Sequence, residues 1–205
     1  MERLGTDSGE YEILQEAARE ARAVDGISIE IGLREGGASQ MMIEALTDPA
    51  IGARVHVAVD PYGGLPYEWQ QDAIAGWVYD DRMRDVALSK LHNMVSGGKN
   101  NVNFIFFNLT DDQFFNRFGD GVPVYHSGEE QIMTVYSIAH LDAVHSVEAI
   151  TAQIEFFDPR MVPGSLIVID DITDFYDTDA VEKVLFDKGF TIFKKGTKKG
   201  AYIKG

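Results

Sequence analysis

The chain has 205 residues, 45% of them hydrophobic, and its 33 acidic and 18 basic residues give a formal net charge of −15. A chain of this length buries one full core but hardly two, so we expect a single domain over residues 1–205. The negative charge repels phosphate backbones and anionic membranes, which argues against nucleic acid or a membrane surface as a partner.

Cysteine is absent, which excludes disulfides, thiolate nucleophiles and thiolate metal ligands and fits a reducing compartment. The first twelve residues are polar and acidic and do not resemble a signal peptide. No apolar stretch approaches the length of a transmembrane helix. We therefore expect a cytoplasmic protein.

Helical and strand-like segments alternate along the chain, which predicts an α/β fold with a parallel sheet and helices on both faces. In chain order, we expect a helix over 11–24, a strand over 27–31, a helix over 38–46, a strand over 55–59, one or two helices over 67–96, a strand over 102–107, a short helix around 114–118, a polar loop over 119–128, a strand over 136–142, a helix over 146–157, a strand over 166–170, a helix over 179–187, and a closing hairpin of 190–194 with 201–203.

Acidic residues follow two of these strands. Asp142 ends one apolar run, and Asp170 and Asp171 close another. Ligands of open α/β sheets bind at the carboxyl ends of the strands, so these three side chains could converge on one ion. Carboxylates without cysteine suit Mg²⁺, Mn²⁺ or Ca²⁺. Alternatively, Asp170 and Asp171 cap the next turn and Asp142 is merely solvated; spacing alone does not decide between the two.

The turn after the first strand indicates which cofactor fits. A dinucleotide fingerprint requires a glycine two residues after Gly32, where this chain has Arg34, and no Walker motif occurs. What remains is a tight turn from Glu30 to Ser39 that brings backbone close to a ligand. Asp60, after the neighbouring strand, could accept hydrogen bonds from two ribose hydroxyls. Alternatively, the glycines simply shape the turn and Asp60 is an ordinary turn residue.

Four segments carry a family resemblance: EIGLREGGAS at 30–39, DPYGGLP at 60–66, HLDAVH at 140–145 and PGSLIVIDD at 163–171. In order and spacing they resemble class I S-adenosylmethionine-dependent methyltransferases, most closely the group of macrocin-type sugar O-methyltransferases and cephalosporin hydroxylase-like proteins. The resemblance covers residues 26 to 172. It implies a Rossmann-like class I methyltransferase fold, in which a seven-stranded sheet has six parallel strands and one antiparallel strand.

The resemblance also implies roles for single residues. Glu30, Gly32 and Gly36 would line the methionine end of S-adenosylmethionine, in the turn that Ser39 closes, and Asp60 would hold the ribose. Asn108 and Asp111 would lie near the adenine. The acids that would bind Mg²⁺ are Asp142, Asp170 and Asp171.

The implied reaction is a Mg²⁺-dependent O-methyl transfer to a hydroxyl of a small molecule, either a sugar or a catechol-like compound, with Asp142 and His145 as the catalytic residues. Sugar methyltransferases of this group commonly carry an acid where this chain has Val144, which weakens the sugar alternative. His145 occupies the place of the lysine base of catechol-type enzymes, and imidazole suits proton removal at neutral pH. Alternatively, His145 caps the next helix.

Two other functions stay open from the residues alone: an NAD-binding Rossmann-type oxidoreductase, and a non-catalytic module that keeps the cofactor fold. Residues 66–98 and 119–128 are expected to be insertions on the substrate side, and they match no pattern that names the acceptor. Many proteins of this fold pair as homodimers, so a homodimer is one expectation here, although the sequence does not fix the oligomeric state.

Overall fold

The computed structural model describes residues 3–6, 8–70, 73–96, 100–126, 128–172 and 176–205. Its elements, in chain order, are α1 (Tyr11–Glu20), the 3-10 turn η1 (Ala21–Ala23), β1 (Ile27–Ile31), α2 (Gly37–Leu46), β2 (Arg54–Val59), β3 (Leu65–Gln70), β4 (Ala73–Tyr79), α3 (Asp81–Ser96), β5 (Val102–Phe107), α4 (Asp111–Phe118), β6 (Val122–His126), β7 (Glu129–Met133), β8 (Tyr136–Leu141), α5 (Val147–Phe157), η2 (Asp158–Arg160), β9 (Leu166–Ile169), α6 (Thr178–Asp187), β10 (Phe190–Lys195) and β11 (Gly200–Lys204). Within the described ranges, no helix is long and apolar enough to cross a membrane.

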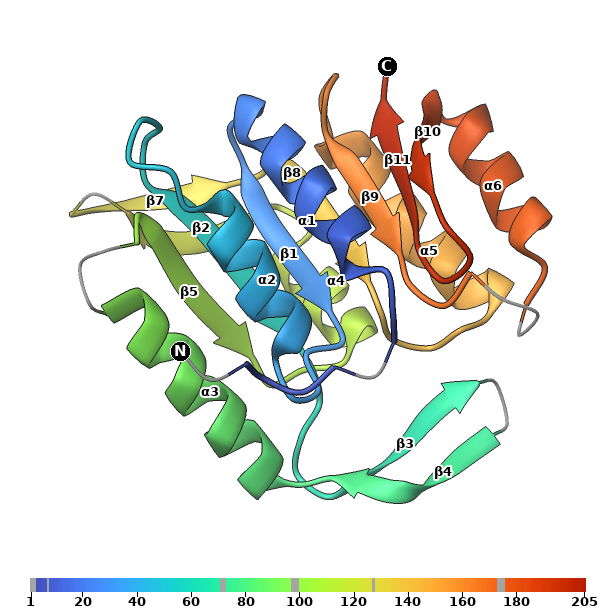
Figure 1. Cartoon of the computed structure of the whole chain (residues 1–205), viewed down its shortest axis with the longest axis horizontal. Coiled ribbons are helices and arrows are strands. Elements are labelled where there is room, and N and C mark those ends of the chain that lie inside the picture. The colour runs from blue at the N-terminus through green and yellow to red at the C-terminus, as the bar shows by residue number, and fades with distance from the viewer. Residues whose placement is uncertain (1–2, 7, 71–72, 97–99, 127, 173–175) are drawn as a thin grey trace.

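A seven-stranded sheet in the order β10-β11-β9-β8-β1-β2-β5 forms the centre of the molecule (Figure 1). The pairs from β9 through β8, β1 and β2 to β5 are parallel. β11 runs antiparallel to both β9 and β10. The expected sheet, with its antiparallel closing hairpin, is therefore confirmed.

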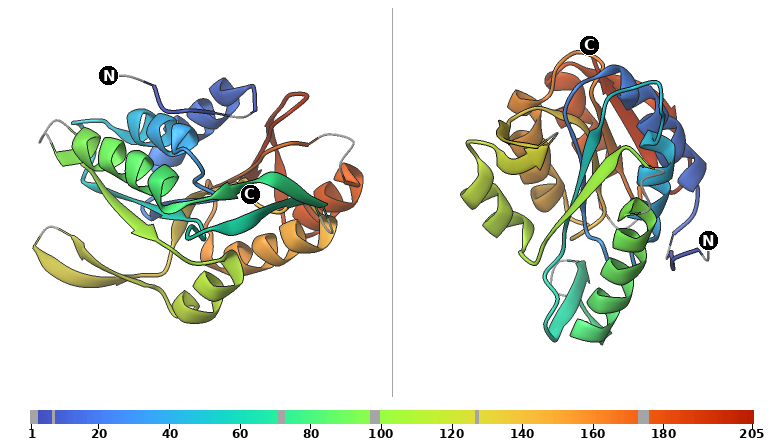
Figure 2. Two further views of the ribbon diagram at one scale, coloured as in Figure 1. Left: turned by 90° about the horizontal axis from the view of Figure 1, so that it is seen from below. Right: turned by 90° about the vertical axis from the view of Figure 1, so that its left-hand side faces the viewer.

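Helices cover both faces of this sheet (Figure 2). The apolar core under α1, α2 and α3 is separate from the core under α4, α5 and α6. Because successive strand residues point to opposite faces, Ile27, Ile29 and Ile31 of β1 enter the second core, whereas Ser28 and Glu30 lie on the first face. The polar strand residues thus share one face, under α1 and α2.

Residues 67–79 were expected to be helical, and that prediction is wrong. Residues 67–70 and 73–79 lie in β3 and β4, a hairpin that projects from the carboxyl edge of the sheet, and the helix α3 begins only at Asp81 (Figure 1). The segment is rich in aromatic and β-branched residue types such as Trp69, Ile74 and Val78, which favour strands. Gly97 and Gly98, expected to end the helix, lie outside the described residues.

The polar loop predicted over 119–128 is also wrong, because β6 runs through it and pairs with β7. Alternation explains the strand: Val122 and Val124 are buried, whereas Pro123 and Tyr125 are exposed. The Tyr125 carbonyl accepts a hydrogen bond from the Asn103 side chain at 3.3 Å. The hairpin therefore lies beside the start of β5, away from the carboxyl edge of the sheet.

Candidate active site

Five segments meet at the carboxyl edge of the sheet, because the ladder hydrogen bonds continue one residue past the strands. Asp60 N donates to Phe107 O at 3.2 Å, and Gly32 N donates to Val59 O at 2.9 Å. In the same way Asp142 N donates to Ile31 O at 2.8 Å, and Asp170 N donates to Leu141 O at 3.0 Å. These bonds align Asp60, Gly32, Asp142 and Asp170 along one edge, where open α/β sheets bind their ligands.

Gly32 is required by close approach of two chain segments. A Cβ atom at this position would lie 1.9 Å from the carbonyl oxygen of Asp142, and the backbone has a φ of 99°. Side chains are disfavoured on both counts. The glycine therefore brings the turn after β1 against the segment after β8, which carries the predicted catalytic residues.

The turn ends in α2, whose N-cap is Gly36 with a φ of 84°. Ser39, in the first turn of the helix, is fully buried and points toward the sheet, where its hydroxyl donates to the Glu30 carboxylate. His56 Nε2 lies 2.8 Å from the same hydroxyl. Ser39 thus fixes Glu30 from below the turn.

These bonds belong to a longer chain of side-chain contacts, which we call the polar row: Ser28, His56, Ser39, Glu30, His140, Asp170, Lys199 and Ser8. It crosses β2, β1, β8 and β9 beneath α1 and α2. His140 Nδ1 lies 3.1 Å from Glu30 Oε1, and His140 Nε2 lies 3.8 Å from Asp170 Oδ2. Burial, with a contribution from His140, lowers the pKa of His56 to about 3, so His56 is neutral.

Asp60 is almost fully buried at the end of β2, and its Oδ2 accepts a hydrogen bond from Arg34 N at 2.7 Å. Burial raises the pKa of this carboxyl to about 7, although the backbone hydrogen bonds from Arg34 and Leu33 oppose the shift. Hydroxyl groups of a bound ligand would donate further hydrogen bonds to this carboxylate and favour its charged form.

Asn108 and Asp111 follow β5. Asn108 Oδ1 accepts from Tyr62 N at 2.7 Å, which ties the segment after β2 to the segment after β5. Asp111 begins α4, and its carboxylate accepts from Gln153 of α5 at 2.8 Å. Both residues brace neighbouring elements in this structure, close to the carboxyl edge.

His145 lies between two of the predicted acids. Its Nε2 is 4.0 Å from Asp142 Oδ1 and 4.0 Å from Asp171 Oδ2, and the imidazole is buried. The N-cap of α5 is Ser146, whose hydroxyl accepts from Ala149 N at 3.1 Å. Capping is therefore not the task of His145.

Asp171 has an unusual backbone for a residue other than glycine, with a φ of 49°. Burial, together with the neighbouring Asp170, raises the pKa of its carboxyl, and His145 opposes that shift. Strained residues of this kind persist where the surrounding structure holds them and are concentrated at functional sites.

Whether a divalent ion fits here depends on Asp170. Ligand atoms of His140, Asp142 and Asp170 lie within 4.8 Å of one another, which would suit an ion. However, the Lys199 ammonium is bonded to Asp170 Oδ2, and both side chains are fully buried. Burial opposes ionisation of Asp170, but Lys199 outweighs it and lowers the pKa of this carboxyl. Lys199 therefore already provides a positive charge at Asp170, one of the three acids that were predicted to bind the ion.

Lys199, Ser8 and the bonding of His140 were not anticipated from the sequence. Lys199 belongs to the glycine- and lysine-rich turn GTKKG, which looks solvent-exposed. His140 carried a signal, because it shares strand parity with Asp142. Ser8 precedes α1 and carries none.

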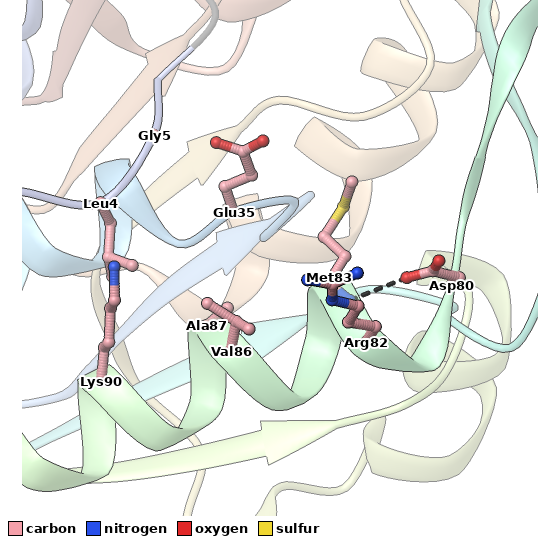
Figure 3. A pocket seen from close by; sticks show the side chains of 9 residues that line it. All are labelled: Leu4, Gly5, Glu35, Asp80, Arg82, Met83, Val86, Ala87 and Lys90. Carbon is pink, nitrogen blue, oxygen red and sulfur yellow. Dashed lines mark hydrogen bonds between the residues drawn. The ribbon is translucent and has the colours of Figure 1, made fainter.

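A cavity of about 270 Å³ adjoins the glycine-rich turn (Figure 3). Glu35 of the turn and Leu4 and Gly5 of the N-terminal segment line one side of the cavity. The other side is lined by α3 and the residue before it: Asp80, Arg82, Met83, Val86, Ala87 and Lys90. Asp80 Oδ1 accepts from Met83 N at 2.8 Å and thereby fixes the start of α3. The lining offers both charges and an apolar strip, which suits a polar small molecule.

Comparisons with known proteins agree with this architecture. The family described as "Methyltransferase domain" matches residues 29–172. Among solved structures, CalS11, described as a TDP-rhamnose 3'-O-methyltransferase of calicheamicin biosynthesis, has a TM-score of 0.61 at 13% identity over 95% of this chain and 78% of that chain. No curated protein matches the chain.

Two further structures show the same likeness of fold. The O-methyltransferase NovP has a TM-score of 0.58 at 14% identity over 95% of this chain and 78% of that chain. TomG from Streptomyces achromogenes, an O-methyltransferase of tomaymycin synthesis solved with S-adenosylmethionine, has a TM-score of 0.57 at 14% identity over 98% of this chain and 82% of that chain.

Proposed function

The chain belongs to the methyltransferase domain family, and we propose that it is an S-adenosylmethionine-dependent O-methyltransferase acting on a hydroxyl of a small molecule. The observation that carries the proposal is the edge where Gly32, Asp60 and Asp142 are aligned by continued ladder bonds. An NAD-dependent oxidoreductase is not favoured by the family match. A non-catalytic protein would have no need of His145 between two carboxylates.

In this proposal, residues at the ends of β1, β2 and β5 would hold the cofactor. Gly32 and Gly36 let the backbone approach the methionine end, and Glu30 fixes that end from within the polar row. Asp60 accepts from the ribose hydroxyls, and binding would exchange one of its present backbone partners for them. Three neighbours complete the site: Ser39 positions Glu30, whereas Asn108 and Asp111 hold the adenine side.

Methyl transfer needs alignment and a deprotonated acceptor oxygen, because the sulfonium is already an activated leaving group. His145 would take the proton from the acceptor hydroxyl, and bound S-adenosylmethionine would supply the methyl group to the oxygen and leave as the neutral thioether. The products are a methyl ether, S-adenosylhomocysteine and a protonated imidazole. Asp142 and Asp171, each 4.0 Å from His145 Nε2, stabilise that charge.

The Mg²⁺ predicted at Asp142, Asp170 and Asp171 stays a prediction, and no step above depends on it. When bound, such an ion would orient the acceptor hydroxyl and lower its pKa. Asp170 does not fit as a ligand while Lys199 neutralises it. A homodimer and a cytoplasmic location likewise stay predictions.

The neighbouring elements indicate on which side of the site the acceptor would bind. We assign the acceptor side to residues 66–98, since α3 lines the cavity beside Glu35. The 119–128 segment is left out of it, because β6 lies beside the start of β5. Sugars and catechol-like compounds both carry the hydroxyls that this chemistry uses, and the opposite charges along α3 favour a polar acceptor.

The test is an assay with methyl-labelled S-adenosylmethionine and a panel of nucleotide sugars and catechols, read as acceptor-dependent S-adenosylhomocysteine formation. His145→Ala should lower turnover by about 10² to 10⁴-fold, the usual contribution of a general base, without changing S-adenosylhomocysteine affinity. Lys183→Ala, at an exposed position on α6 outside the assigned site, is the control. Wild-type turnover in His145→Ala would remove His145 from the chemistry.

A further inference from the structure

Lys199 is a lysine in an unexpected place. Its side chain is fully buried, although lysine is almost never buried unless it is paired. The ammonium donates to Asp170 Oδ2 and to the Ser8 hydroxyl, and it lies 4.0 Å from the centre of the Tyr11 ring. The ammonium is thus paired with a carboxylate, a hydroxyl oxygen and the face of an aromatic ring.

The turn that carries Lys199 is held in position by α1. The Glu10 carboxylate, at the start of that helix, accepts from Thr197 N at 3.0 Å, from Lys198 N at 2.7 Å and from Lys199 N at 3.1 Å. On the other side, Ile172 N donates to the Lys198 carbonyl at 2.9 Å. The backbone on both sides of the ammonium is therefore fixed, so its place beside Asp170 is built into the fold.

The same oxygen of Asp170 faces the candidate ion site. Asp170 Oδ2 is the atom bonded to Lys199, and it is also the atom 3.8 Å from His140 Nε2. A divalent ion ligated by Asp170 and Asp142 would therefore share a small, buried space with an ammonium group. Like charges at such a distance repel strongly in a buried site.

Building on the proposed function, we propose that Lys199 is the resident cation of this site and replaces a divalent ion at Asp170. Lys199 is then a positioning residue: it keeps Asp170 charged and in place at the end of β9, next to Asp171 and His145. Methyl transfer by this chain would need no Mg²⁺.

The experiment is a titration with MnCl₂ alone, followed by the electron paramagnetic resonance signal of free Mn²⁺. We expect the wild-type chain to show no site that depends on Asp170. Lys199→Ala should gain one, with affinity raised about tenfold or more, because it leaves Asp170 as an uncompensated buried carboxylate. Lys198→Ala removes the same charge from an exposed neighbour and should gain nothing.

Two results would overturn the proposal: a wild-type Mn²⁺ site that Asp170→Asn abolishes, or a folded Lys199→Ala that gains no site. If Lys199→Ala does not fold, the proposal is judged by the wild-type titration alone: it stands if the wild-type chain has no Mn²⁺ site that Asp170→Asn abolishes. S-adenosylhomocysteine binding is measured on the same samples. Failure of the wild-type chain to bind S-adenosylhomocysteine would refute the proposed function, whereas the Mn²⁺ result would still judge the role of Lys199.

Discussion

The two faces of the central sheet are both covered by helices and both bury an apolar core, yet they differ in the polar side chains buried beside that core. Under α4, α5 and α6 the core is apolar and aromatic; the Phe115 and Phe156 rings stack at 4.1 Å, and Tyr136 meets Phe157 edge to face at 5.1 Å. Under α1 and α2 runs the polar row, from Ser28 to Lys199 and Ser8.

From this difference we infer that the face under α4, α5 and α6 contributes mainly to stability, whereas the polar row contributes mainly to function. Burying a polar side chain costs free energy unless it is hydrogen-bonded, and burying a charge costs more unless it is paired. An apolar set of the same volume would hold α1 and α2 to the sheet at least as well. We infer that the polar row is kept because it positions Glu30 and Asp170 at the carboxyl edge. Substitutions on the two faces should therefore have different consequences.

The largest effect is expected on the apolar face. Phe157→Ala removes a fully buried ring and should lower the free energy of unfolding by about 3 to 5 kcal/mol. Urea denaturation measures this loss. S-adenosylhomocysteine affinity of the folded variant should be unchanged, and a parallel loss of affinity would contradict the division between the faces.

On the functional face, removing a charge should stabilise the protein. The pKa of Asp60 is about 7 in the fold, against an ordinary value of 3.8. The native carboxyl therefore holds its proton while the unfolded one has lost it, so stability falls as pH rises from about 4 through 7. Asp60→Asn removes this slope.

The free energy of unfolding of Asp60→Asn should exceed that of wild type by an amount that grows from about pH 4 to 7 and is constant above pH 7. This difference should be no more than about 4 kcal/mol, since one pKa unit corresponds to about 1.4 kcal/mol. Urea denaturation at several pH values gives the difference. A stability difference between wild type and Asp60→Asn that stays constant from pH 4 to 8 would show that the fold does not raise the pKa of Asp60.

The same substitution should damage binding. Asp60→Asn replaces a charged acceptor of ribose hydroxyl groups and should weaken S-adenosylhomocysteine binding by about 1.5 to 3 kcal/mol, the scale of hydrogen bonds to charged groups. Calorimetry at pH 8, where the wild-type carboxylate is ionised, measures the loss. Unchanged affinity would remove Asp60 from the pocket.

The smallest effect is expected within the polar row. Ser39→Ala deletes the hydroxyl between Glu30 and His56 and should lower the free energy of unfolding by about 1 to 3 kcal/mol, because both partners lose a buried hydrogen bond. Unlike Phe157→Ala, it should also weaken S-adenosylhomocysteine binding, through Glu30. A loss of stability without any loss of affinity would make Ser39 a packing residue only.

The sheet was predictable because its strands are continuous apolar runs bounded by turns, and because acids and glycines mark where they end. The β3–β4 hairpin was missed although its aromatic and β-branched residue types favour strands, because large side chains also pack on helices and the segment runs directly into the helix α3. Lys199 could not be predicted, since its burial depends on Glu10, nearly the whole chain away in sequence, accepting hydrogen bonds from the turn. Local patterns carry no information about such a contact.

Titration calorimetry of the wild-type chain with S-adenosylhomocysteine, beside NAD, tests the central claim most directly. We predict one site for S-adenosylhomocysteine with micromolar affinity and no heat with NAD. No binding of S-adenosylhomocysteine at concentrations far above micromolar, or binding of NAD in its place, would contradict the assignment of the carboxyl edge as a methyltransferase site.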